Sequence, residues 1–232
     1  MSEQIVDAQL IETNEVLSKA KSFWDKNGNY ITLFLVGLII VVGGFLGYKQ
    51  FIIKPKEEKA ADAIYKAQQY FQQDSARLVL EGDGTNKGVL YIINNYGGTK
   101  AANLAHYYAG VSYLKLGEFN KAIEHLKDFK TDAKQIQAAA YGVLGDAYAE
   151  VGKNDDAIDS YKKAGSTFEF DEALSSEYLF RAALLSATLK KDKEALDLFK
   201  SLKEKFPKTE KAQQADKYIN KISVEKADLS VN

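Results

Sequence analysis

Two stretches of this chain repeat each other at an offset of 35 residues, and this repeat constrains the fold more than any other feature. Small and aromatic residues recur at matching places, so that Gly110, Tyr113, Gly117, Ala122, Leu126 and Phe129 correspond to Gly145, Tyr148, Gly152, Ala157, Tyr161 and Ala164. A third, weaker copy at an offset of 38 contains Ala183, Ser186, Lys190, Ala195, Phe199 and Leu202, and we attribute its three extra residues to the intervening loop. A repeat of this length is typical of a solenoid of helix pairs.

The repeated residue types suit two antiparallel helices joined by a short turn. Small residues at the eighth and twentieth places of each copy allow two helix axes to approach to roughly 8–10 Å. Gly117 and Gly152 follow the first helix of each pair, where a glycine can adopt the left-handed conformation that ends a helix. The sequence therefore predicts an all-α fold of repeated helix–turn–helix units.

These residues resemble the consensus of the tetratricopeptide repeat, which spans about 34 positions. Pro207 occupies the last consensus place of the third copy. A further match aligns Thr99, Ala102, Ala105 and Tyr108 with Thr209, Ala212, Ala215 and Tyr218, and threonine is a suitable helix N-cap. We therefore expect residues 99–222 to form tetratricopeptide repeats closed by a capping helix from Thr209 to about Ile222, and residues 223–232 to form a flexible tail.

Residues 30–48 form a second decisive segment, which reads YITLFLVGLIIVVGGFLGY and contains no charged residue and no proline. A helix of this length spans roughly the 30 Å of a bilayer core. Trp24, Tyr30 and Tyr48 lie near its ends, where aromatic rings favour the headgroup region. We predict one transmembrane helix after a short leader over residues 1–29. A buried core helix and a cleaved signal peptide are the alternatives, and the late start of the segment argues against the signal peptide.

Two properties of this segment leave alternatives open. Gly43 and Gly47 form a small-xxx-small spacing at which another membrane helix can pack closely, although glycine is also common in membrane helices generally. The flanking lysines are nearly balanced, and they comprise Lys19, Lys21 and Lys26 before the span and Lys49, Lys54, Lys56 and Lys59 after it. This count leans toward a cytoplasmic C-terminal part, but large domains are translocated largely regardless of such counts.

Composition argues against several classes of function. The 31 Lys and Arg residues against 32 Asp and Glu residues provide no basic field for nucleic acid, and the absence of cysteine removes disulfide and thiol chemistry. His106 and His125 occur without any zinc-protease, serine-hydrolase or phosphate-binding motif. Residues 81–86 lack the ligand spacing of an EF-hand, so we interpret them as a turn between helices. We expect no catalytic, metal or cofactor site and no small-molecule substrate.

Residues 49–98 are expected to form a membrane-proximal helical hairpin. Its first helix runs from Glu57 to about Leu80 and its second from Lys87 to Tyr96, with apolar positions at Ala60, Ala61, Ile64, Ala67, Tyr70, Phe71, Val89, Leu90, Ile92 and Ile93. Pro55 fits either the first turn of a helix or a break after the membrane span. The hairpin would cap the solenoid and connect it directly to the membrane.

A leader, one span, a lysine-rich exit, a hairpin ending in YGGTKA (residues 96–101) and tetratricopeptide units together resemble the YfgM-like ancillary subunits of the SecYEG translocon. Members of that family are bacterial inner-membrane proteins with a periplasmic repeat domain, and they associate with a membrane-anchored prolyl-isomerase-like chaperone. The resemblance implies a cytoplasmic N-terminus and a non-catalytic role in holding secretory proteins or chaperones near the SecYEG translocon. Two alternatives stay open: a cytoplasm-facing scaffold tethered to the membrane, and a cell-division or envelope-assembly coordinator.

The first helix of each unit should line the inner surface of the solenoid, which predicts a peptide-binding groove. Repeat places 5, 9, 12 and 13 are occupied by Tyr107, Val111, Leu114 and Lys115, by Gly142, Asp146, Ala149 and Glu150, and by Phe180, Leu184, Ala187 and Thr188. This partly apolar set suits an extended or helical peptide, although several members could instead pack against neighbouring helices. Tyr107 and Phe180 are the candidate anchors, and we expect loss of both side chains to weaken partner capture without unfolding the domain.

Overall fold

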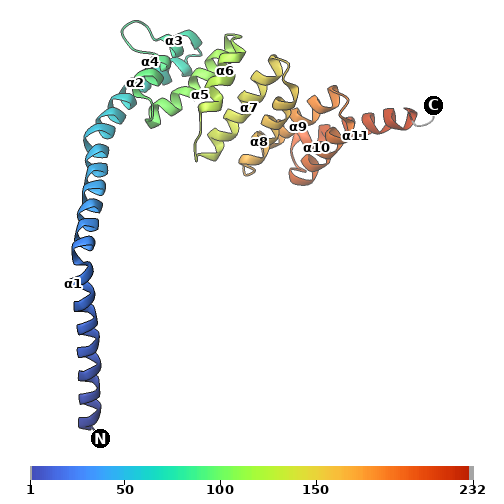
Figure 1. The fold of residues 1–232 in the computed structure, drawn as a ribbon. Coiled ribbons are helices and arrows are strands. Elements are labelled where there is room, and N and C mark those ends of the chain that lie inside the picture. The colour runs from blue at the N-terminus through green and yellow to red at the C-terminus, as the bar shows by residue number, and fades with distance from the viewer. Residues whose placement is uncertain (1, 230–232) are drawn as a thin grey trace. The chain divides into compact units, whose positions relative to one another are not determined.

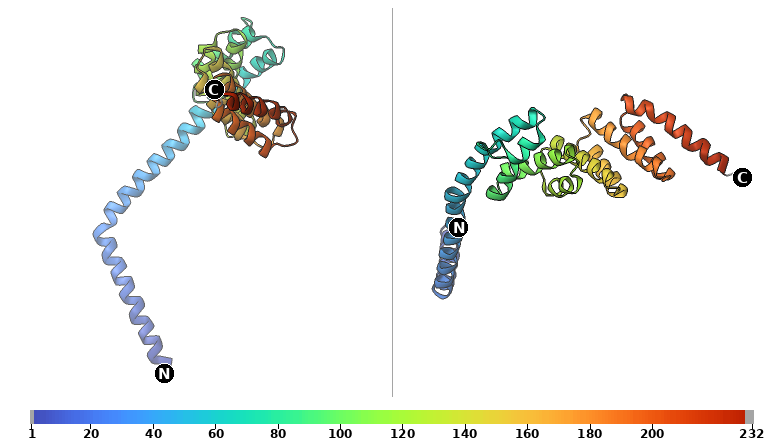
Figure 2. Two further views of the ribbon diagram at one scale, coloured as in Figure 1. Left: turned by 90° about the vertical axis from the view of Figure 1, so that its right-hand side faces the viewer. Right: turned by 90° about the horizontal axis from the view of Figure 1, so that it is seen from above.

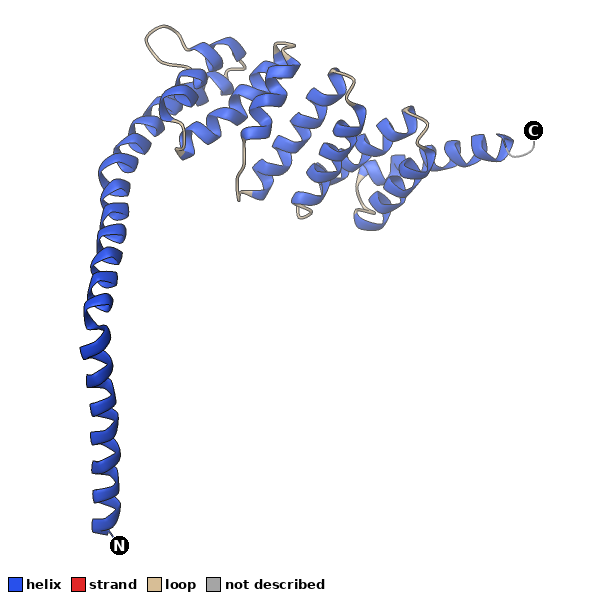
Figure 3. Ribbon diagram, viewed as in Figure 1, coloured by secondary structure: helices blue, strands red, loops and turns tan. Residues whose placement is uncertain are grey.

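The computed structural model describes residues 2–229, which are helical apart from short loops (Figures 1 and 3). Within them the only β pairing is an isolated bridge between Gly82 and Lys87. The elements are α1 Ser2–Tyr48, the π-helix η1 Lys49–Ile53, α2 Lys54–Gln72, α3 Ala76–Glu81, α4 Val89–Tyr96, α5 Lys100–Lys115, α6 Phe119–Asp128, α7 Lys134–Glu150, α8 Asn154–Thr167, α9 Glu172–Thr188, α10 Asp192–Lys205 and α11 Glu210–Leu229. The side chains of residues 1–16, 19, 20 and 225–232, which include most of the predicted leader and tail, lie outside the described residues.

The chain divides into two compact units, Met1–Pro55 and Lys56–Asn232. The first contains α1, which ends at Tyr48, the last residue of the predicted span. An 18-residue window of this helical region has a mean hydropathy of 2.4, and none of the window is buried. The helix is thus long and apolar enough to cross a membrane, and its apolar side chains are available to lipid.

In the second unit the helices pack in chain order. α5 pairs with α6, α7 with α8 and α9 with α10, and α11 packs against α9 and α10. Consecutive helices lie side by side through this series (Figure 2). The predicted solenoid of helix–turn–helix units is confirmed.

Glycines have two structural roles in the repeat, as the sequence predicts: they end helices, and they allow close contact between helices. Gly117 and Gly152 end the first helices in the left-handed conformation, with φ angles of 76° and 73°. Gly110 and Gly145 allow the two helices of a pair to touch, because an added Cβ would lie 2.4 Å from Cγ of Leu126 at Gly110 and 2.6 Å from the ring of Tyr161 at Gly145.

The third copy keeps the left-handed turn without its glycine, since Lys190 has a φ angle of 58°. Its offset of 38 does not come from a longer loop. α8 has 14 residues where α6 has 10, while loop 168–171 is one residue shorter than loop 129–133. The prediction that the extra residues lie in the loop is therefore wrong, because they extend α8.

Threonine caps begin α5 and shape the entry to α11. The Thr99 hydroxyl accepts from the Ala102 amide at 3.0 Å and donates to the Tyr96 carbonyl at 2.8 Å. Thr209 repeats both contacts, accepting at 3.3 Å and donating to Phe206 at 2.8 Å. α11 then continues past Ile222 to Leu229, so the helix is longer than the predicted cap.

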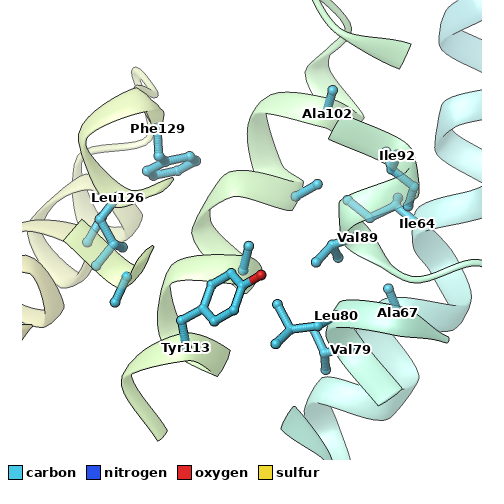
Figure 4. Packing of buried hydrophobic residues seen from close by; sticks show 14 of the residues in the cluster. Ile64, Ala67, Val79, Leu80, Val89, Ile92, Ala102, Tyr113, Leu126 and Phe129 are labelled. Atoms are coloured by element: carbon cyan, nitrogen blue, oxygen red, sulfur yellow. The ribbon is translucent and has the colours of Figure 1, made fainter. Parts of the chain in front are cut away.

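Residues 54–96 form three helices, α2, α3 and α4, where the sequence predicts a hairpin of two. The chain turns between α2 and α3, where Asp74 has a φ angle of 58°. This turn brings Val79 and Leu80 back into the buried cluster that contains Ile64 and Ala67 (Figure 4). The predicted helix from Glu57 to Leu80 is interrupted because its last apolar residues pack against its own middle.

Polar contacts attach α2 to the start of the first repeat. The Glu57 carboxylate accepts from the backbone amides of Lys100 at 2.9 Å and Ala101 at 3.3 Å. Lys56 Nζ donates to the Gly97 carbonyl at 2.8 Å. An acidic side chain at a helix N-terminus is favourable, so α2 supplies part of the cap of α5.

Candidate functional site

The predicted groove residues lie on α5, α7 and α9, but the structure covers three of them. Val111 and Phe180 are only 9% and 6% exposed. Gly142 is also buried, because a Cβ there would lie 2.0 Å from the ring of Tyr178. The repeat pattern places these positions on an open surface, whereas neighbouring helices pack over them.

The more accessible predicted residues do not form one patch. Lys115, at the end of α5, forms an ion pair with Asp74, and its Nζ lies 5.5 Å from the centre of the Phe71 ring. Leu184 and Thr188 line a separate cavity of about 200 Å³ together with Ala187, Lys190, Asp192, Tyr218, Lys221 and Ile222. Leu114 and Ala149 are half-buried, and Glu150 is exposed.

A larger depression, which we call the α2–α5–α7 groove, has a volume of about 540 Å³. It is lined by Gln68, Phe71, Gln72, Leu104, Tyr107, Tyr108, Gln135, Ile136 and Ala139. Although 27% of the chain is charged, no charged residue belongs to this lining. The groove is therefore an uncharged surface of aromatic, aliphatic and amide groups.

Aromatic packing fixes the wall of the groove. The ring centres of Phe71 and Tyr108 are 4.7 Å apart, and those of Tyr107 and Tyr108 are 5.7 Å apart. Tyr107 also packs against Phe129, at 5.4 Å, in the loop after α6. Burial raises the pKa of both Tyr107 and Tyr108, so both phenols are neutral at physiological pH. Rings held in this way are already positioned for a ligand.

The polar groups of the groove are amides. Gln68, Gln72 and Gln135 contribute them from α2 and α7. A glutamine side chain both donates and accepts hydrogen bonds, as a peptide backbone does. Such groups match a neutral backbone segment better than a carboxylate or an ammonium group.

Of the predicted site residues, only Tyr107 lines the α2–α5–α7 groove. The sequence interpretation assigned Phe71 to a separate hairpin and so missed that α2 forms a wall of the groove. One local signal was available: Phe71 and Gln72 lie three and four residues after Gln68, so both lie on the face of the helix that carries Gln68.

Asp146 belongs to a paired network. Its Oδ1 accepts from Tyr161 Oη at 2.7 Å and from Arg181 Nη1 at 2.8 Å. Arg181 Nε also donates to Glu177 at 2.7 Å, and the second Glu177 oxygen lies 3.0 Å from Lys211 Nζ. Burial and the hydrogen bond to Asp146 raise the pKa of Tyr161. The carboxylates of Asp146 and Glu177 are thus paired with Arg181 and Lys211. Together with Tyr161, these side chains join α7, α8, α9 and α11.

The acidic turn between α3 and α4 satisfies its own hydrogen bonds. Asp83 Oδ1 accepts from the backbone amides of Thr85 and Asn86, at 2.9 and 2.6 Å, and Oδ2 accepts from Tyr70 Oη at 2.6 Å. The Tyr70 hydrogen bond, with those from Asn86, holds the pKa of Asp83 well below its ordinary value. In the described part of the chain, no group of three or more His, Asp or Glu is arranged to hold a metal ion.

Gly43 and Gly47 lie on α1, where an added Cβ would meet no atom within 4 Å. Both positions are therefore open notches on the helix. A second membrane helix can approach closely at such a site.

Two family models match parts of this chain. A family model described as a tetratricopeptide repeat-like domain matches residues 21–141, which is more than half of the chain, and one described as a tetratricopeptide repeat matches residues 177–209. Among solved structures, the chain is similar to nearly identical TPR-like repeats of a protein described as a kinesin light chain from Podosopora anserina. That match has 11% identity and a TM-score of 0.49, and it covers 74% of this chain and 97% of the other. No curated protein matches the chain.

Proposed function

This chain belongs to the tetratricopeptide repeat-like domain family, and on that premise we propose that it is a membrane-anchored protein-interaction scaffold with no catalytic role. One observation carries the proposal, namely the α2–α5–α7 groove of about 540 Å³ with an uncharged, aromatic lining. A concave apolar surface with a few polar groups is the usual form of a binding site. α1 supplies the anchor.

The groove suits an apolar protein segment with few charges. Phe71 and Tyr107 offer aromatic surfaces, and Ile136, which is 42% exposed, offers an aliphatic one. Aromatic side chains in preformed pockets contribute disproportionately to binding energy. The glutamine amides can hydrogen-bond the backbone of the same segment.

We further propose that the N-terminus is cytoplasmic, that the repeat domain is periplasmic, and that the protein is an accessory of the Sec translocon. Its partners would then be SecYEG, a membrane-anchored periplasmic chaperone and secretory proteins. The resemblance to YfgM-like subunits supports this role, and an apolar groove suits segments of incompletely folded clients. Gly43 and Gly47 would contact a neighbouring membrane helix.

The second candidate is a cytoplasm-facing scaffold, tethered to the membrane, that assembles another complex. Four lysines follow the span within eleven residues, and three precede it within the same distance. Because cytoplasmic flanks tend to be richer in lysine, this count favours the second candidate.

Protease access separates the two candidates. A tag after Asn232 should be digested in intact spheroplasts if the repeat domain is periplasmic and protected if it is cytoplasmic. Two controls are needed. A cytoplasmic protein should resist digestion in intact spheroplasts, and the tag should be digested in lysed ones. Protection in intact spheroplasts, with digestion after their lysis, would overturn the export role.

Crosslinking tests the groove itself. A photoreactive residue at Gln135 should label a SecYEG subunit or the anchored chaperone in native membranes, and Ile136→Ser should reduce that labelling severalfold. Phe170→Ser is the matched control, because Phe170 is 95% exposed and lies outside the groove lining. Equal labelling in both variants would contradict the assignment of this groove.

A further inference from the structure

The two histidines of the chain meet between α5 and α6. Nδ1 of His106 lies 3.2 Å from Nδ1 of His125, and their ring centres are 5.3 Å apart. Both residues are partly buried. At this separation the two nitrogens share a hydrogen bond, which requires one Nδ1 to donate a proton and the other to present a lone pair.

The surroundings fix the pair in place. The Tyr113 ring stacks on His125 at 5.4 Å with an angle of 10° between the planes, and Lys121 Nζ lies 5.2 Å from the centre of the Tyr113 ring. His125 is therefore held between His106 and Tyr113. Rotation away from His106 would break this aromatic packing.

Charged groups act on the pair from α6. Burial lowers the pKa of both histidines, and the neighbouring His106 lowers that of His125 further. Glu124 and Asp128 oppose this effect at both rings, whereas Lys121 adds to it at His125. Besides burial, Glu118, which directly precedes α6, and Glu81 of α3 raise the pKa of the Tyr113 phenol, and Lys121 lowers it. The net balance favours the uncharged pair.

We propose that the His106–His125 pair is an acid-sensitive latch between α5 and α6. The latch is closed while at least one ring is neutral, because a hydrogen bond then joins the helices. When both rings are protonated, two N–H donors and two positive charges face each other at a distance that suits only a hydrogen bond. The pair must then separate, and α6 loosens from α5.

This opening bears on the groove. Tyr107 follows His106 directly, and its ring packs on Phe129 at the end of α6. Loosening α6 therefore removes the support of one groove wall. Only this consequence rests on the proposed function: a segment held in the α2–α5–α7 groove is released as the pH falls.

The full chain in detergent micelles can be titrated directly, because it has only two histidines. Selective ¹⁵N-histidine labelling gives one set of ring signals for each, followed by NMR from pH 8 to pH 5. We expect two coupled steps, the second well below the ordinary pKa, and an Nδ1 of mixed donor and acceptor character above them. Independent titration of both rings at ordinary values would overturn the latch.

Hydrogen exchange of residues 119–128 reports the opening. After correction for the intrinsic pH dependence of exchange, each proton bound on opening raises the opening equilibrium constant at most tenfold per pH unit. We expect acid to speed exchange in α6 of the wild type, and His125→Gln and His106→Gln to reduce that acceleration. An α6 whose corrected exchange is the same at pH 8 and pH 5 would also overturn the latch. Neither measurement uses a partner, so failure here is distinct from failure of the scaffold role.

Discussion

Replacing Phe180 by alanine decides between its predicted role in the groove and its observed position in the core. Its ring centre lies 5.7 Å from that of Phe199 and 5.5 Å from that of Tyr218, and Lys211 Nζ lies 5.1 Å from the ring centre. Removing a buried phenylalanine side chain costs about 3–5 kcal/mol, which includes the loss of such contacts. A whole domain is stable by only about 5–15 kcal/mol, so we expect this replacement to lower the stability severely.

The effect should be confined to the C-terminal repeats, because the units of a solenoid contact only their neighbours. Hydrogen exchange of the full chain in micelles should show α10 and α11 opening more than about a hundredfold more often, since each 1.4 kcal/mol is a factor of ten. α5 and α6 should be unchanged. Leu184→Ala is a control on the same helix, where the side chain is 36% exposed and the expected cost is below about 1 kcal/mol.

One result would refute this reasoning. If Phe180→Ala stays within about 1 kcal/mol of the wild-type stability and yet loses partner capture, Phe180 acts at the binding surface, as the repeat pattern predicts. A joint loss of stability and capture would support the core position.

Three further outcomes are expected. Gly145→Ala should lower the thermal midpoint by overpacking worth about 1–3 kcal/mol, because the new Cβ would lie 2.6 Å from the Tyr161 ring; an unchanged midpoint would contradict the tight seam. Lys190→Gly should raise the free energy of unfolding by about 0.5–1 kcal/mol, because lysine is strained at a φ angle of 58°; a lower value would show that the side chain contributes more than the strain costs. Because the pKa values of His106 and His125 are below 6.5 in the fold, the unfolded chain binds more protons at acid pH. Urea midpoints should therefore be highest above about pH 7 and fall as the pH drops through 6.5 toward the folded pKa values, and double replacement by glutamine should reduce that fall.

Local chemistry explains which parts of the fold could be predicted. Gly117 and Gly152 predict left-handed turns, and Thr99 predicts a helix cap, because each of these features depends on one residue type at one position. The break at Asp74 has only a weak marker, since aspartate tolerates the left-handed conformation but neither glycine nor proline stands there. It arises because Val79 and Leu80 pack against distant residues, which local sequence does not encode.

The candidate groove was harder to predict for a related reason. A consensus repeat assigns places 5, 9, 12 and 13 to the inner surface, but it assumes that each unit has ordinary neighbours. Phe180 is buried because Tyr218 of the terminal helix packs on it, and Phe71 enters a groove wall because α2 packs beside the first repeat. The burial of Phe180 and the position of Phe71 in the groove wall both arise at the ends of the repeat array, where a repeat packs against a helix that is not part of a repeat.

The contacts of Lys56 and Glu57 with the start of α5 determine where this protein can be cut. A fragment that begins at Thr99 would lose the acceptor for the Lys100 amide and the buried residues Val79, Leu80, Val89 and Ile92. A cut just before Lys54 would leave all of these in place. A fragment produced by proteolysis should therefore keep all of these contacts and its core only if the cut falls before Lys56.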